Sequence, residues 1–253
     1  MARPAALHVV TREPIEEGPG TGRRIVLVHG SMDRASSFSR LTSRLRDFTV
    51  VTYDRRGYAG SAALGPAESF EDQVADLVSV LDGTPAIVFG HSFGGNVVLA
   101  AAAAHPDLVP AAVVWEAPQP WVDWWPRASA SVGLAEVEPE EQAEWFMRRV
   151  VGERVWDRLP ESTRRQRRAE GPALQAEISS LVSRPVFEAE DVKVPVLVGR
   201  GGQSRPHHRR CSRELVASLA RAELVEIPDA GHGAHLTHPS ELAAIIRRAP
   251  DLL

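Results

Sequence analysis

The sequence predicts an α/β fold in which helices cover both faces of a mostly parallel sheet, and two observations support this. Short runs rich in valine and isoleucine recur along the 253 residues, and stretches with helical spacing separate them. Several of these runs are apolar at every position, as expected of strands that are covered on both faces. Strands and helices that alternate in this way are typical of a parallel sheet wrapped by helices.

The predicted elements follow from these patterns. The runs expected to form strands are Leu7 to Val10, Ile25 to Val28, Phe48 to Tyr53, Ile87 to Phe89, Ala111 to Trp115, Val194 to Val198 and Leu224 to Ile227. The stretches expected to form helices are Phe38 to Arg46, Phe70 to Leu81, Phe93 to Ala104, Arg209 to Ala220 and Pro239 to Arg248.

One segment interrupts the alternation. Residues 119–187 are rich in Trp, Arg and Glu and show no convincing strand, and an amphipathic helix pair is predicted from Pro139. The segment lies between two predicted strands, so we expect it to form a helical cap over the carboxyl edge of the sheet, where ligands bind in open α/β folds. The predicted division is a core of residues 1–118 and 188–253 with a cap of residues 119–187.

Composition narrows the classes of partner and compartment. The formal charge of −4 gives no reason to expect a nucleic-acid partner, and the local basic runs are interpreted as solvated helix faces. Cys211 is the only cysteine, and the sequence contains neither a signal-peptide pattern nor an apolar run of membrane-spanning length. We therefore expect a cytoplasmic protein with a small-molecule substrate and no membrane partner. The sequence does not indicate whether the protein is a monomer or an oligomer.

The strongest chemical signal is the stretch IVFGHSFGGNVVLA, in which Gly90, Ser92 and Gly94 form G-x-S-x-G between a predicted strand and a predicted helix. This order is typical of a nucleophile elbow, where a serine sits on a strained turn and flanking side chains would collide with the backbone. The alternative is a chance glycine-rich turn in which the serine caps the helix.

A second motif, RRIVLVHGSMDRASSF, ends a buried strand at His29 and Gly30. A serine that attacks a carbonyl creates an oxyanion, which needs two preorganised backbone N–H donors. The predicted donors are Phe93, which follows the serine, and either Ser31 or Met32 in this loop. His29 itself is interpreted as a structural histidine that holds the loop by hydrogen bonds.

A third motif, LVEIPDAGHGAHLTHP, places His232 between two glycines in a loop after a predicted strand. An imidazole there could reach across the sheet toward Ser92 and act as its general base. His235 and His238 are weaker alternatives because both lie closer to the next predicted helix.

Together, HG at 29–30, DRRGYAGS at 54–61, GHSFGG at 90–95 and AGHGAHLTHP at 230–239 resemble the α/β-hydrolase superfamily over nearly the whole chain apart from the insertion. Ala59 departs from the glycine common at its position in the second motif, which we interpret as structural. The resemblance implies an α/β-hydrolase fold with a helical cap.

In much of that superfamily the triad carboxylate lies in the loop after the strand that follows the cap, here GRGGQSRPHH, which contains no carboxylate. The imidazole needs one to fix its orientation and tautomer. Glu116 is the preferred candidate because it follows the strand before the insertion, and this resembles the acid placement of some haloalkane dehalogenases. Asp229 is the alternative, although it shares a short loop with His232.

These residues predict a serine hydrolase that cleaves a small-molecule ester, thioester or lactone through an acyl-serine, without a metal or organic cofactor. The alternatives are an acyltransferase or cyclase on the same fold, or a non-catalytic small-molecule binding protein. Aromatic residues of the insertion could line an apolar pocket. The candidates are Trp121, Trp124, Trp125, Trp145 and Phe146.

Overall fold

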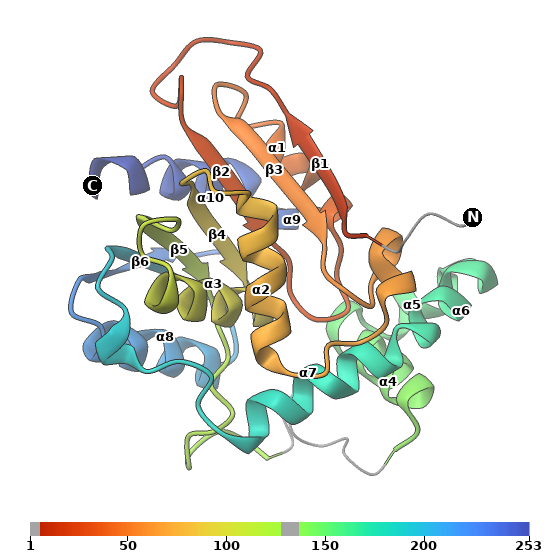
Figure 1. Ribbon diagram of the computed structural model, residues 1–253. Helices are drawn as coiled ribbons and strands as arrows, with labels where there is room; N and C mark the ends of the chain where they lie inside the picture. The colour runs from red at the N-terminus through yellow and green to blue at the C-terminus, as the bar shows by residue number, and fades with distance from the viewer. Residues whose placement is uncertain (1–5, 128–136, 253) are drawn as a thin grey trace.

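The computed structural model describes residues 6–127 and 137–252, which form a seven-stranded sheet with helices on both faces (Figure 1). The order in the sheet is β1-β3-β2-β4-β5-β6-β7, and β1 alone among these strands is antiparallel to its neighbour. The predicted fold class is confirmed. The strands are β1 (His8–Arg12), β2 (Arg24–Val28), β3 (Thr49–Asp54), β4 (Ile87–His91), β5 (Ala111–Trp115), β6 (Val196–Gly201) and β7 (Ala222–Ile227).

The register of the central strands brings their carboxyl ends side by side. Val28 of β2 is paired with Gly90 of β4, and His91 is paired with Trp115 of β5. Trp115 is in turn paired with Gly199 of β6. The segments that follow these strands therefore emerge at one edge of the sheet, although they are far apart in the sequence.

Two separate cores explain why the central strands are apolar at every position. Val26 and Val28 pack on one face of the sheet with residues of α2, α3 and α8, whereas Ile25 and Leu27 pack on the other with residues of α1, α9 and α10. Figure 1 shows α2, α3 and α8 in front of the sheet. These helices are α1 (Ser39–Thr42), α2 (Phe70–Leu81), α3 (Phe93–Ala104), α8 (Pro206–Ser218), α9 (Ala234–Thr237) and α10 (Pro239–Ile246).

The interval between β5 and β6 is helical where it is described, and its helices lie together at one end of the sheet (Figure 1). A third core joins them to the rest of the chain, because Met32 and Tyr58 pack against Met147, Trp156 and Ile178. Residues 128–136 of the predicted cap lie outside the described residues. The helices are α4 (Pro139–Val151), α5 (Glu153–Arg158), α6 (Glu161–Ala169) and α7 (Gly171–Ser183).

The helices differ most from the prediction at α1 and at the start of α8, and α8 and α10 each end two residues before their predicted ends. The helix expected over Phe38 to Arg46 is a 3₁₀ turn (Ala35–Phe38) followed by the short α1, where the Thr42 and Ser43 hydroxyls donate to backbone carbonyls and compete with helix continuation. Helix α8 begins at Pro206 rather than Arg209, since proline suits the first position of a helix. The remaining 3₁₀ segments are Ala59–Leu64, Ala189–Asp191 and Ala249–Leu252.

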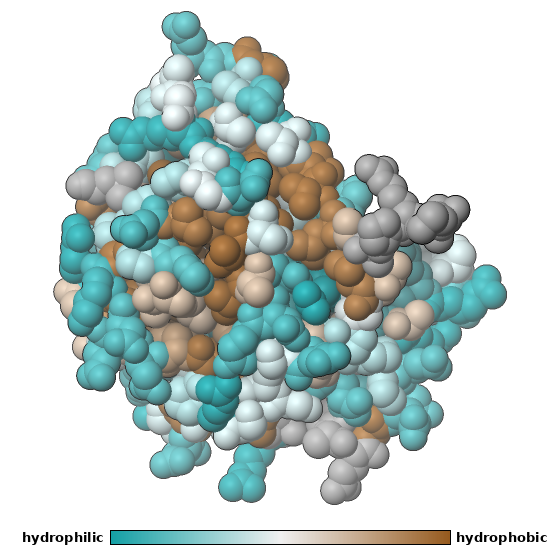
Figure 2. Space-filling model, viewed as in Figure 1, coloured by the Kyte–Doolittle hydropathy of each residue, from teal (hydrophilic) through white to brown (hydrophobic). Residues whose placement is uncertain are grey.

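Within the described part of the chain, no helix is both long and apolar enough to cross a bilayer. Figure 2 shows a hydrophilic surface over α5 and α6, and α6 has no buried residue. Hydrophobic residues gather along β1 in the same view, where Val9 and Val10 are exposed.

Candidate active site

Ser92 stands on a strained turn between β4 and α3. Its φ of 52° and ψ of −123° lie in a region that non-glycine residues rarely adopt. Side chains at the flanking glycines would collide with backbone: a Cβ on Gly90 would lie 2.4 Å from the carbonyl oxygen of Gly94, and one on Gly94 would lie 2.4 Å from that of Val28. The Ser92 side chain makes no cap hydrogen bond to α3 and lines a cavity, which removes the capping alternative.

The carboxylate of Glu116 contacts the imidazole of His232. Oε2 lies 2.7 Å from Nδ1, and Glu116 is 1% exposed. Glu116 follows β5 directly and adopts a φ of 50°, which turns the chain at the carboxyl edge of the sheet. His232 lines the same cavity as Ser92. The structure thus brings Glu116 and His232 into contact at the edge where Ser92 lies, whereas Asp229 is exposed.

The end of β6 holds Glu116 through its main chain. The backbone N–H of Gly201 donates to Oε1 of Glu116 at 2.8 Å, and the backbone N–H of Glu116 donates to the Gly199 carbonyl at 3.1 Å. Asn96 of α3 donates to the carbonyl of Pro118 at 2.9 Å and fixes the turn after the glutamate. Both carboxylate oxygens of Glu116 therefore have partners, as a buried carboxylate requires.

The loop after β2 is held by a buried arginine. Arg55 donates to the carbonyls of His29 and Gly30 and also to Gln73 and Glu177, and it is fully buried. The backbone N–H of Arg55 donates to Nε2 of His29, and Nδ1 of His29 contacts the Gly30 carbonyl at 2.8 Å. A neutral imidazole with its proton on Nδ1 satisfies both contacts. Burial, followed by the charge of Arg55, lowers the pKa of His29 to about 3, in keeping with this neutral form.

Of the three residues predicted to supply oxyanion donors, Ser31 and Phe93 line the cavity. Phe93 is the first residue of α3, so its backbone N–H has no partner within the helix. Met32 instead turns its side chain into the third core, while its carbonyl accepts a hydrogen bond from Arg167 of α6. A Cβ on Gly30 would lie 3.0 Å from that of Ser92, which shows how closely this loop approaches the serine.

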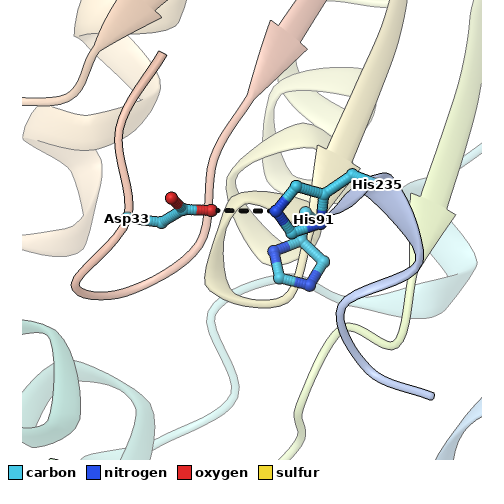
Figure 3. A group of neighbouring side chains, drawn as sticks. All are labelled: Asp33, His91 and His235. Atoms are coloured by element: carbon cyan, nitrogen blue, oxygen red, sulfur yellow. Dashed lines mark ion pairs between the residues drawn. The ribbon is translucent and has the colours of Figure 1, made fainter. Parts of the chain in front are cut away.

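A second group of ionisable side chains lies beside this site (Figure 3). Oδ2 of Asp33 is 3.3 Å from Nε2 of His235, and the His235 ring packs against that of His91 with centroids 4.4 Å apart. Nε2 of His91 contacts the carbonyl of His232 at 3.0 Å. Burial of Asp33 would raise its pKa, but its contact with His235 outweighs this and lowers it. His235 therefore contacts Asp33 and takes no part in the contact between Glu116 and His232.

The cavity beside Ser92 has a volume of about 280 Å³ and is bounded by the sheet edge, α3, α4, α7 and the start of α8. Its lining mixes apolar and ionisable side chains. The lining residues are Ser31, Ser92, Phe93, Pro118, Phe146, Arg149, Val150, Glu177, Ile178, Leu181, Gln203, Ser204, Arg205, His207, His208 and His232.

Among the aromatic residues predicted to bind substrate, Phe146 is a member of this lining. Trp145, its neighbour, is 38% exposed and packs against Arg149. Trp125 is buried and lies behind the lining, with its ring 4.9 Å from that of His207 and 5.6 Å from that of His208.

The other two tryptophans are engaged elsewhere. Trp121 packs edge-on against Phe187, with ring centroids 5.9 Å apart. The indole N–H of Trp124 donates to Glu214, and the guanidinium of Arg210 lies 4.0 Å from the centre of its ring. Neither residue is part of the cavity lining.

Sequence reasoning missed the basic residues of the lining. His208 stacks on His232 with centroids 4.6 Å apart, and its Nδ1 is buried without a hydrogen-bond partner among the described residues. Arg205 and His207 adjoin it, and Arg149 comes from α4. For Arg205, His207 and His208 the sequence signal was Arg205-Pro206, a helix start that places His207 and His208 in the first turn.

Two groups within the described residues have the donor atoms for a metal ion. They are Asp33 with His91 and His235, and Glu116 with His208 and His232, and the donor atoms in each group lie within 4.8 Å of one another. In the second group the 2.7 Å contact between Glu116 and His232 already uses the facing donor atoms. In the first, Nε2 of His91 already contacts a carbonyl.

The sequence of the chain matches a family of known proteins. Residues 25–245 match the model of the family described as "Alpha/beta hydrolase family". Among curated proteins, "Putative carbamate hydrolase RutD" of Caulobacter segnis is 29% identical over 244 residues, which cover 87% of this chain and 89% of that protein. The "2-(acetamidomethylene)succinate hydrolase" of Mesorhizobium japonicum is 35% identical over 94 residues, 36% of this chain and 34% of that protein.

The overall fold also matches solved structures. The enol-lactonase from Burkholderia xenovorans LB400 superposes with a TM-score of 0.73 at 24% identity, covering 97% of this chain and 96% of that one. At this identity the likeness supports the fold alone.

Proposed function

Because the chain belongs to the alpha/beta hydrolase family of enzymes, we propose that it is a serine hydrolase that cleaves a small-molecule ester, thioester or lactone through an acyl-serine intermediate. Ser92 is the proposed nucleophile, His232 the general base and Glu116 the acid that orients the histidine. One observation carries the proposal: the 2.7 Å contact between Glu116 and His232 beside the strained turn of Ser92.

In the first step His232 takes the hydroxyl proton of Ser92 as its oxygen attacks the substrate carbonyl carbon. Glu116 contacts Nδ1, so the opposite ring nitrogen, Nε2, is the one that receives the proton. The buried carboxylate stabilises the imidazolium that forms. His232 then gives the proton to the leaving group, the bond between carbonyl carbon and leaving group breaks, and an acyl-serine remains.

In the second step the same histidine deprotonates a water molecule, which attacks the acyl-serine. The tetrahedral intermediate collapses, the proton returns to the Ser92 oxygen, and the carboxylic acid product leaves. The sequence of steps needs no redox partner.

The negative charge of each tetrahedral intermediate needs backbone donors. The N–H of Phe93 is one proposed donor, because the helix provides it with no partner, and Ser31 or Met32 provides the other. Arg55 holds the carbonyls of His29 and Gly30 and so limits the movement of this loop. Removal of one such donor typically lowers kcat by about a hundredfold or more.

The relatives differ in the substrates that their names state, so the substrate proposed here depends on this chain's own residues. The cap boundaries at residues 119 and 187, the cytoplasmic location and the absence of a nucleic-acid or membrane partner stay predictions.

A fluorophosphonate probe tests the nucleophile directly. We expect the probe to label Ser92, with labelling lost in Ser92→Ala and strongly slowed in His232→Ala. A panel of 4-nitrophenyl esters, thioesters and lactones, with Ser92→Ala as the blank, then tests turnover, and product analysis with a competing amine separates hydrolysis from acyl transfer. Absence of both labelling and Ser92-dependent turnover would contradict the proposal.

A further inference from the structure

The cavity beside Ser92 has an unbalanced set of charges. Two arginines line it from different parts of the chain: Arg149 from α4, and Arg205 from the loop before α8. The sole carboxylate among the lining residues is Glu177 of α7, and it is bound by the buried guanidinium of Arg55. The described lining therefore offers positive charge without an available carboxylate to balance it.

Neither lining arginine forms an ion pair within the described part of the chain, and Arg149 rests instead on the ring of Trp145. Neighbouring arginines of α4 and α6 are engaged: Arg148 pairs with Glu144, Glu153 and Asp157, and Arg168 pairs with Glu144 and Glu161. Carboxylates are thus plentiful on this part of the surface, but within the described residues none pairs with Arg149 or Arg205, which are both exposed at the cavity lining.

The start of α8 adds a second attraction for anions. The 13-residue helix directs the positive end of its dipole toward the cavity, because its first-turn residues His207 and His208 belong to the lining. Helices favour acidic residues in this turn, yet α8 has none and its N-cap residue Arg205 makes no side-chain cap hydrogen bond.

The pKa values of His207 and His208 also reflect the positive charge near the start of α8. Burial is the main cause that lowers the pKa of both His207 and His208, and nearby positive charges lower it further, Arg205 among them. His208 also keeps its buried Nδ1 without a hydrogen-bond partner among the described residues. A ligand that accepted a hydrogen bond at this position would satisfy that group if Nδ1 carries the proton.

We infer that the substrate of this site carries a carboxylate, which binds between Arg205, Arg149 and the first turn of α8 while its ester carbonyl lies at Ser92. Guanidinium groups pair with carboxylates through charge-assisted hydrogen bonds, which give orientation as well as affinity. The cavity of about 280 Å³ restricts the substrate to a small molecule. The inference rests on the proposed hydrolase function and specifies its substrate class.

Paired esters of equal chain length test it. We expect the wild-type kcat/KM to be at least about tenfold higher for mono-4-nitrophenyl glutarate than for 4-nitrophenyl pentanoate, which lacks the carboxylate. Arg205→Gln and Arg149→Gln should each reduce this ratio severalfold, chiefly by raising KM for the glutarate ester. Arg205→Glu should shift the preference toward an ester that bears a quaternary ammonium group.

Arg165→Gln is the matched control. Arg165 lies exposed on α6 and is not part of the cavity lining, so removing its charge should leave the ratio unchanged. Circular dichroism confirms that each variant is folded.

The outcomes separate the two proposals. Ser92-dependent hydrolysis of both esters with a ratio near one would overturn the carboxylate inference and leave the hydrolase function intact. A ratio that falls equally in Arg165→Gln would also overturn it, because the effect would then come from overall charge. A protein that hydrolyses neither ester and does not react with the fluorophosphonate would overturn the proposed function itself.

Discussion

Oε2 of Glu116 lies 2.7 Å from Nδ1 of His232, although 116 positions separate the two residues in the chain. Under the proposed mechanism Glu116→Gln lowers kcat by about a thousandfold or more, because an amide cannot stabilise the imidazolium and favours the wrong tautomer. Turnover of an activated ester measures this. Asp229→Asn is the control, since that carboxylate is exposed and outside the contact. Loss of activity in Asp229→Asn with normal turnover in Glu116→Gln would show that the acid is misassigned.

The buried pair of Arg55 and Glu177 should be sensitive to the loss of either partner. Arg55→Met leaves the Glu177 carboxylate buried without its counter-charge, and we expect the free energy of unfolding in urea to fall by about 3–5 kcal/mol. The double variant Arg55→Met/Glu177→Met should recover a large part of that loss, because no uncompensated charge remains. Equal stability of the single and double variants would contradict this account.

Stability should also decline in mildly acidic solution because of buried histidines. Burial, followed by the charges of His235 and His232, lowers the pKa of His91 well below its ordinary value of about 6.5. Below that value the unfolded chain binds a proton that folded His91 does not, so the free energy of unfolding falls as the pH falls. Each such histidine contributes a slope of about 1.4 kcal/mol per pH unit until its folded form also protonates.

Urea denaturation of His91→Gln between pH 6.5 and 5 measures this contribution. The dependence of unfolding free energy on pH should be shallower in the variant than in the wild type by about one proton. The comparison variant is His105→Gln, which changes an exposed imidazole at the end of α3. An unchanged slope in His91→Gln would mean that His91 takes up its proton equally in both states.

Neighbouring aromatic residues should differ in their effect on substrate binding. Phe146 lines the cavity, so Phe146→Ala should raise KM for longer acyl chains by about fivefold, which corresponds to about 1 kcal/mol of lost apolar contact. Trp145→Ala provides the control because Trp145 lies outside the lining. A chain-length series of 4-nitrophenyl esters distinguishes the two. The same rise in KM for both variants would argue for a general disturbance of α4.

The fold and part of the site could be predicted because their signals are local. The strand before Ser92 and the helix after it surround the motif directly, and Glu116 follows an apolar run at a predictable edge of the sheet. The pairing of Asp33 with His235 could not be predicted, since it depends on how the loop after β2 meets the short helix α9, 202 positions away. For the tryptophans, composition indicates burial but not which side of a helix faces a cavity. The cavity residues Arg205, His207 and His208 were missed because the predicted start of α8, at Arg209, lies three residues too late.

The main-chain contact from Gly201 to Glu116 has a consequence for how such a site can diversify. If Glu116 orients the histidine, the end of β6 supports that task through the peptide N–H of Gly201 and uses no side chain, since a Cβ there would lie 2.2 Å from the carbonyl oxygen of Ala230. The side chains from Gln203 to His208 then take no part in orienting the histidine, so selection can change them for substrate binding. Substitutions there could redirect substrate preference while the machinery of bond cleavage stays intact, which makes this loop a natural starting point for laboratory evolution.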